Sequence, residues 1–299
     1  MSLLNKLVVT AMPIIPRSVV GRVARRYIAG TMLADAVRVV NGLNKAGMMT
    51  TIDLLGEDIQ EAGEARQVQS NINRILQAIK ENGLDSNVSV KPTQLGLLID
   101  EELCYKNIRS IVDEAKRLNN FVRIDMEDAR TTDGTLEIYR RLRQEGYANL
   151  GVVIQAYLHR SESEVRALVK ERANIRLCKG IYNESPSIAF KDRQQIRDNF
   201  LKLLQIILDG GAYVGIATHD DYLIERAYAL VQRLGLKRTQ YEFQMLLGVR
   251  EAWRDQIVKD GHRLRVYVPY GEQWYAYSTR RLKENPSMAW YITKAIFVR

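Results

Sequence analysis

Short β-branched runs alternate with amphipathic stretches of helical period from Met48 onward, and this alternation constrains the fold more than any other feature. Eight strands are predicted, at Met48–Leu54, Asn87–Lys91, Phe121–Asp125, Gly151–Tyr157, Ile175–Lys179, Ala212–Thr218, Tyr241–Met245 and Arg265–Pro269. The helical stretches between them are predicted at Ala65–Glu81, Glu102–Asn119, Leu136–Glu145, Ser163–Ala173, Arg193–Leu208, Tyr222–Arg233 and Ala252–Lys259. Eight β/α units in about 240 residues favour a closed parallel α/β barrel over a doubly wound sheet.

The barrel is expected to form a single catalytic domain. Residues 1–46 are amphipathic and predict an N-terminal helical arm, and residues 47–299 predict the barrel with a C-terminal helix. Cys104 and Cys178 lack zinc-like spacing, so we expect reduced thiols, a cytoplasmic location and no metal site. The apolar amino terminus is interrupted by Pro13 and Pro16, which indicates mature protein, and no apolar run reaches the roughly 18 residues that a membrane span needs.

The charge balance is basic but dispersed. There are 44 Lys and Arg residues against 35 Asp and Glu residues, a net charge of +9. Because these charges are spread along the chain, they favour an anionic small molecule or an anionic membrane surface, and we expect no nucleic-acid partner.

Polar residues fall where the predicted strands end. These residues are Lys91, Asp125, Gln155, Tyr157, Arg176, Lys179, Thr218, His219, Asp220 and Gln244. Because the carboxyl ends of barrel strands share one mouth, we expect these groups to meet at a common rim.

The segment after the last strand is predicted to form a helix from Glu272 to Asn285 that closes over this rim. Tyr277, Arg280, Arg281 and Glu284 have the spacing of one helical face. Two neighbouring guanidinium groups can grip one carboxylate from two sides. The alternative is a solvated basic pair, with Arg280 ion-paired to Glu284.

Other strand-end groups also have two interpretations. Lys91 could pair with a substrate carboxylate or form a Schiff base, and the alternative is a solvated strand-end lysine. In RIDMED we expect one inward acid, Asp125, paired with Lys91, and two solvated acids, Glu127 and Asp128. A lone histidine such as His219 is more often structural than catalytic.

Common catalytic motifs are absent from the sequence. No GxGxxG follows the first strand, and no GxxxxGK[ST], HExxH, GxSxG or EF-hand loop occurs. This excludes the usual dinucleotide-binding folds, P-loop nucleotide triphosphatases, zincins, serine hydrolases of the GxSxG type and calcium sensors.

Seven motifs in register carry a family resemblance. They are KPTQLGL, RIDMED, VVIQAYLHR, IRLCKGIYNE, ATHD, EFQMLLGVR and RVYVPYGEQWYAYSTRRLKENP. Over residues 48–286 they resemble the monofunctional bacterial proline dehydrogenases. The resemblance implies a distorted (βα)8 TIM barrel with noncovalent FAD beneath its eighth helix. It also implies oxidation of L-proline to 1-pyrroline-5-carboxylate, the first step of proline catabolism, by hydride transfer from proline C5 to flavin N5, with electrons passing to a membrane quinone.

The resemblance also implies roles for individual residues. Arg280, Arg281 and Lys91 would bind the proline carboxylate, and Glu284 would tether the arginine clamp. Asp125 and Arg176 would be catalytic, Asp125 by holding Lys91 and Arg280 and Arg176 by lying near flavin N5. FAD would be lined by Met126, Gln155, Arg176, Lys179, Gly180, Ile181, Thr218 and His219, and the substrate ring would be packed by Tyr267, Tyr277 and Tyr182. The family usually has Ala at the position of Ile181, where we expect tolerance.

Two alternatives from other classes remain open at this stage. A Schiff-base aldolase would use Lys91 or Lys179 as nucleophile and would be colourless. A noncatalytic basic protein on a membrane surface or nucleic acid would lose binding with salt. The family's candidate downstream partner is 1-pyrroline-5-carboxylate dehydrogenase, and the terminal segment MAWYITKAIFVR is a candidate for peripheral docking at the inner face of the membrane.

Overall fold

The predicted strands are confirmed, and they close into one parallel barrel in the order β1 to β8. The structure, a computed structural model, describes residues 21, 24–56, 59–275, 277 and 278. The strands are β1 (Met49–Leu54), β2 (Ser86–Val90), β3 (Val122–Ile124), β4 (Leu150–Gln155), β5 (Asn174–Cys178), β6 (Tyr213–Ala217), β7 (Tyr241–Leu246) and β8 (Leu264–Tyr270). Their ends differ from the predicted ends by at most two residues.

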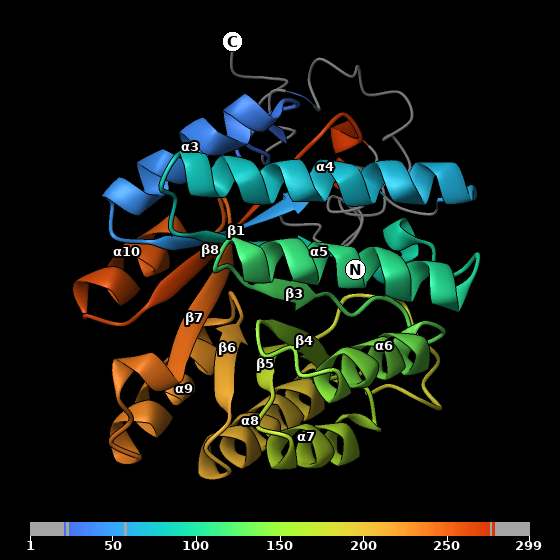
Figure 1. The fold of residues 1–299 in the computed structure, drawn as a ribbon. Coiled ribbons are helices and arrows are strands. Elements are labelled where there is room, and N and C mark those ends of the chain that lie inside the picture. Colours follow the sequence, from blue (N-terminus) through green and yellow to red (C-terminus); the bar gives the residue numbers. More distant parts are fainter. Residues whose placement is uncertain (1–20, 22–23, 57–58, 276, 279–299) are drawn as a thin grey trace, which may run out of the picture.

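Helices lie outside the ring of strands (Figure 1). They are α3 (Leu33–Lys45), α4 (Ala62–Glu81), α5 (Glu101–Arg117), α6 (Thr132–Gln144), α7 (Ser161–Lys170), α8 (Arg193–Asp209), α9 (Asp221–Arg233) and α10 (Glu251–Lys259). Short 3₁₀ helices at Pro92–Leu95 and Arg238–Gln240 add to them. The helical stretches predicted between the strands are all confirmed.

Apolar side chains fill the layer between strands and helices, whereas many of those inside the barrel are polar. In β2, Val88 and Val90 belong to the apolar core, and the alternating Asn87 and Ser89 are buried polar residues. Successive side chains of a strand face opposite sides, so one face of β2 packs on helices and the other lines the barrel. A barrel interior is usually packed with branched apolar residues, so the polar filling is informative.

The described part of the N-terminal arm packs on the barrel. Ala36, Val40 and Leu43 of α3 join the apolar core. The backbone before α3 hydrogen-bonds to the end of β8, with Ala29 N donating to Pro269 O at 2.9 Å. The arm therefore lies beside the segment that follows the last strand.

That segment turns at Gly271, whose φ of +139° favours glycine. Tyr277 N donates to Gln273 O at 3.3 Å, so the start of the predicted closing helix is present. Arg280, Arg281 and Glu284 lie outside the described residues.

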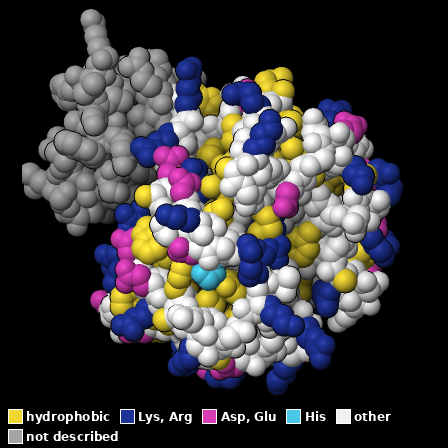
Figure 2. Space-filling model, turned by 90° about the vertical axis from the view of Figure 1, so that its left-hand side faces the viewer, with side chains coloured by type: hydrophobic (Ala, Val, Ile, Leu, Met, Phe, Trp, Pro, Cys, Tyr) yellow, Lys and Arg dark blue, Asp and Glu magenta, His cyan; other side chains and the backbone are white. Residues whose placement is uncertain are grey.

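Basic side chains are dispersed on the face shown in Figure 2, with acidic and uncharged groups between them. This agrees with the dispersed charge seen in the sequence. Within the described residues no helix is long and apolar enough to cross a membrane.

Candidate active site

Buried polar groups gather at the carboxyl ends of the strands, as the sequence predicts. Asp53 lies on β1, Lys91 and Asp125 directly follow β2 and β3, and Gln155 and Arg176 lie on β4 and β5. Each of these residues is at most 8% exposed. Water is therefore largely excluded, which strengthens the electrostatic interactions among them.

Asp125 is the centre of a hydrogen-bonded group that spans the barrel interior. Its Oδ1 accepts from Arg176 Nη1 and from Ser89 Oγ, both at 2.6 Å. Its Oδ2 accepts from the Tyr267 hydroxyl at 2.9 Å. Burial and the charge of Asp125 raise the pKa of Tyr267 well above its usual value, so the phenol remains a proton donor.

Arg176 is fixed by more than the Asp125 carboxylate. Its Nε donates to Gln244 Oε1 at 2.6 Å, and its guanidinium lies 5.3 Å from the centroid of the Tyr267 ring. Contacts from β7 and β8 therefore hold this cation in one orientation. The sequence predicted Asp125 and Arg176 as site residues, and the structure brings them into direct contact.

The predicted ion pair between Lys91 and Asp125 is wrong, because Lys91 Nζ pairs with Asp53. Burial alone would lower the pKa of Lys91, but the carboxylates of Asp53 and Asp125 raise it, so the side chain is an ammonium. Asp53 Oδ2 is buried without a hydrogen-bond partner among the described residues. Sequence analysis missed Asp53, although its position on the inward face of β1, two residues after Thr51, was the available signal.

The expectation that Glu127 is solvated is also wrong. Glu127 is 6% exposed, and its two carboxylate oxygens accept from Thr93 N at 2.9 Å and Thr93 Oγ1 at 2.6 Å. Glu127 therefore anchors the 3₁₀ turn that follows Lys91. Asp128 lies nearer the surface and pairs with Arg130.

Gln155 and Met126, both predicted to line a cofactor, come together at the ends of β4 and β3. Gln155 Nε2 donates to Met126 O at 3.2 Å, and its Oε1 is buried with no partner among the described residues. This hydrogen bond fixes the orientation of the amide, and Oε1 can accept a hydrogen bond from a bound molecule.

Gly180 follows β5 and has φ of +103°, the left-handed region that favours glycine. A Cβ at this position would collide with the Tyr157 ring. Lys179, one residue earlier, pairs with Asp220 at 3.1 Å, and Arg197 Nη2 pairs with the same carboxylate at 2.7 Å. The loop that begins at Lys179 is thus tied to the end of β6.

Thr218 and His219 lie directly after β6, as predicted. Leu246 N donates to His219 Nε2 at 2.8 Å, which places the proton of the neutral imidazole on Nδ1. Thr218 is buried, and its hydroxyl accepts from Asp220 N at 3.2 Å. His219 thus has a structural hydrogen bond on one nitrogen and a donor on the other.

The predicted aromatic residues are placed differently from one another. Tyr277 is buried with Ala24, Ile28 and Leu55, and Leu55 directly follows β1, so Tyr277 lies at the carboxyl end of that strand. Tyr182 is half-buried on the loop after β5, where the neighbouring Ile181 is 43% exposed.

Two buried cations lie at the mouth, and each is matched by an acid. Lys91 pairs with Asp53, and Arg176 pairs with Asp125. Such a site can orient a small polar molecule by charge, with the Tyr267 hydroxyl already donating to Asp125.

Comparison with known proteins identifies the family. Residues 36–293 match the family model described as proline dehydrogenase. The chain is 41% identical over 273 residues to proline dehydrogenase 1 of Bacillus subtilis (strain 168), covering 91% of this chain and 90% of that protein. It is 35% identical over 277 residues to a proline dehydrogenase of Deinococcus radiodurans, covering 91% of this chain and 89% of that protein.

A solved structure with the same fold is proline utilization A (PutA) from Bdellovibrio bacteriovorus inactivated by N-propargylglycine. Its TM-score is 0.83 at 24% identity, and the match covers 92% of this chain and 34% of that chain. The present chain therefore spans about a third of that neighbour's length. The fold likeness agrees with the sequence matches, which cover nearly all of both proteins: the chain belongs to the proline dehydrogenase family.

Proposed function

We propose that this chain oxidises L-proline to 1-pyrroline-5-carboxylate with bound FAD and passes the electrons to a quinone, as the first step of proline catabolism. The observation that carries the proposal is the group of buried Lys91, Asp125 and Arg176 with the half-buried Tyr267 at the barrel mouth, in a chain of this family. Proline needs a cation for its carboxylate, which Lys91 can supply, and a site that excludes water, which the burial of these side chains favours.

The residues at the mouth fit a flavin. Gln155 Oε1, buried without a partner among the described residues, is suited to accept from a ring N–H, and Nδ1 of His219 carries a proton. The residues that would hold FAD are Met126, Gln155, Arg176, Lys179, Gly180, Ile181, Thr218 and His219. FAD, when bound, accepts the hydride that leaves proline C5.

The protein's own groups would bind and orient the substrate. Lys91 is held charged by two carboxylates and supplies a fixed positive charge for the proline carboxylate. Arg176 is held in place by Asp125 and Gln244. Its guanidinium can therefore stabilise negative charge on a neighbouring group without a change in its own position. Tyr267 remains protonated and presents its ring from β8.

Charge balance supports the predicted clamp. Lys91 and Arg176 are each matched by a carboxylate, so these two buried cations leave little surplus positive charge for an anion. Arg280 and Arg281 would supply that surplus from the closing helix, whose first turn buries Tyr277 against Leu55 at the end of β1. Glu284 would hold them in place.

The aldolase alternative has no support from the geometry. A Schiff-base nucleophile must be a neutral amine, yet neighbouring acids raise the pKa of Lys91. Lys179 Nζ is engaged with Asp220 at 3.1 Å.

The proposal is tested by the visible spectrum of the purified chain and by Arg281→Met. We expect a yellow protein whose flavin absorbance decreases when proline is added in the absence of oxygen. Arg281→Met should keep the flavin but raise the KM for proline about 10- to 100-fold, since a charge-assisted pair is worth about 1.5–3 kcal/mol. Arg226→Met, on the exposed face of α9, is the control. A colourless protein under flavin-retaining conditions, or an unchanged KM, would contradict the proposal.

Electron transfer to a membrane quinone would need contact with the bilayer surface. Sedimentation with anionic liposomes can compare the full chain with a version that ends at Pro286, which lacks MAWYITKAIFVR. Equal binding of the two would reject a role for this terminal segment.

A further inference from the structure

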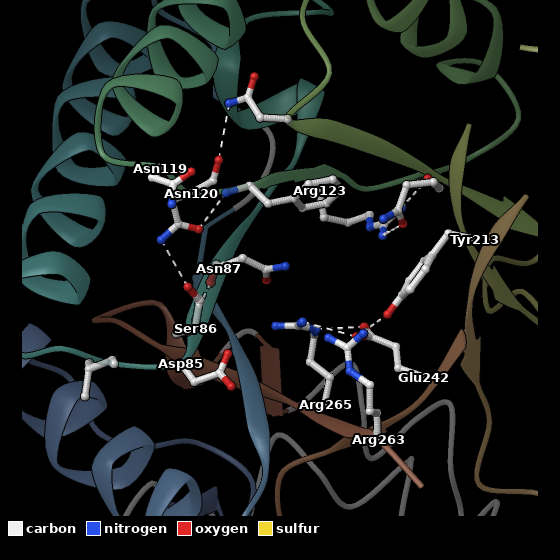
Figure 3. Close-up of a pocket in the computed structure, with 14 residues that line it drawn as sticks. Asp85, Ser86, Asn87, Asn119, Asn120, Arg123, Tyr213, Glu242, Arg263 and Arg265 are labelled. Carbon is white, nitrogen blue, oxygen red and sulfur yellow. Dashed lines mark hydrogen bonds and ion pairs between the residues drawn. The ribbon is translucent and has the colours of Figure 1, made fainter. Parts of the chain in front are cut away.

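The opposite end of the barrel holds a second polar pocket, far from the strand ends described above. It has a volume of about 500 Å³ and is lined by residues at the amino-terminal ends of strands β2 to β8. All of its lining residues except Leu84 and Phe121 carry polar side chains. Figure 3 shows the side chains of Asn87, Arg123, Glu242 and Arg265 around this space. A pocket of this size can take a small organic molecule.

Positive charge exceeds negative charge in the buried part of the lining. Arg263 and Arg265 both contact Met49 Sδ, at 3.1 and 3.4 Å, so two guanidinium groups lie close together. Glu242 is the acid beside them, and Arg265 Nε donates a hydrogen bond to Glu242 Oε1 at 2.7 Å. Asp85, the other acid of the lining, is exposed at the rim. Within the described residues Arg263 has no carboxylate partner.

Arg123 is a further buried cation, and among the described residues no carboxylate forms a direct ion pair with it. The residue is 2% exposed, and its guanidinium donates to the neutral oxygens of Val152 and Asn174, at 2.9 Å to Val152 O and 2.6 Å to Asn174 O. Its Nε is buried without a partner among the described residues. Burial and the neighbouring Arg176 lower the pKa of Arg123 to about 9. A buried cation of this kind is costly unless an anion balances it.

The same lining also holds an unsatisfied acceptor. Asn149 Oδ1 is buried with no partner among the described residues.

We propose that the pocket at the amino-terminal end of the barrel is a binding site for a small oxoanion, carried as a phosphate or carboxylate group, with Arg263 as its accessible anchor. The planar guanidinium fork suits both groups. This site is separate from the proposed proline site and does not depend on the proposed function.

Calorimetric titration of the flavin-loaded enzyme tests the site, with inorganic phosphate in one arm and acetate in the other. We expect saturable binding of phosphate that weakens about tenfold or more in Arg263→Gln, because one charge-assisted pair is lost. Arg263→Lys, which keeps the charge but not the fork, should weaken it less. Arg226→Gln removes an equal charge from exposed α9 and should leave the affinity unchanged. Binding of acetate as well assigns the site to oxoanions in general, and binding of phosphate alone assigns it to phosphates.

The carboxyl-end site needs its own control, because Lys91 could also attract an anion. Lys91→Met should leave phosphate binding intact if the anion occupies the pocket at the opposite end. Loss of binding in Lys91→Met, equal affinity in wild type and Arg263→Gln, or no saturable heat with either anion would each overturn the proposal.

Discussion

The ion pair between Asp125 and Arg176 offers the sharpest test of how the site is held. Asp125→Asn keeps the size of the side chain and one acceptor oxygen but removes the charge. The Arg176 side chain is 8% exposed, so its guanidinium would stay buried without a carboxylate. Removing one member of a buried pair costs about 3–5 kcal/mol, and the acceptor that remains reduces this loss, so we expect about 2–3 kcal/mol.

A double-mutant cycle separates this pair from general damage. Urea unfolding of Asp125→Asn, Arg176→Met and the double variant should give a coupling free energy of at least about 1 kcal/mol, because the double variant no longer buries a lone charge. Asp128→Asn with Arg130→Met is the control, since the Arg130 side chain is 74% exposed and the pair should show almost no coupling. Additivity within about 0.5 kcal/mol for Asp125 and Arg176 would refute the reasoning.

Three more predictions follow from individual residues. Lys91→Met should raise the KM for proline at least about tenfold with the flavin spectrum intact, since a charged partner of the carboxylate is lost, and an unchanged KM would remove Lys91 from the substrate site. Gly180→Ala should cost about 1–3 kcal/mol and lower FAD occupancy, because Cβ is strained at this φ and collides with Tyr157, whereas wild-type melting and occupancy would refute this. Burial opposes ionisation of Glu242, but Arg265 lowers its pKa to about 2. The unfolded value is higher, so this stabilisation should be full above about pH 4.5 and lost toward pH 2. Acid unfolding should show this loss, and Glu242→Gln should abolish that part of the pH dependence.

The fold was predictable because its signal is local. Each strand is a short β-branched run and each helix an amphipathic one, and both patterns can be recognised without tertiary contacts. The short 3₁₀ turn at Pro92–Leu95 was not predicted, because it depends on the distant carboxylate of Glu127 binding Thr93.

The site was predictable in its members but not in its pairings. Asp125 and Arg176 stand out as polar groups at strand ends, so their common location follows from the barrel alone. Which acid pairs with Lys91 depends on the register between strands. Asp53 of β1 is in register with Ser89 of β2, two residues before the lysine. Sequence spacing within one strand carries no information about that register, so the neighbour on β1 was missed.

The polar interior joins the two ends of the barrel into one electrostatic unit. Gln244 accepts from Arg176 with Oε1 and donates to Glu242 Oε1 with Nε2, both at 2.6 Å. Gly215 on β6 makes room for this amide, because a Cβ there would meet Gln244 Cδ at 2.8 Å. If the Gln244 amide were flipped, its NH2 would face the Arg176 donor and its oxygen would face the Glu242 carboxylate. Ionised Glu242 therefore fixes the direction of both hydrogen bonds of Gln244. Protonation of Glu242 removes that constraint, and acid can therefore loosen Arg176 at the mouth through a carboxylate on the far side of the barrel.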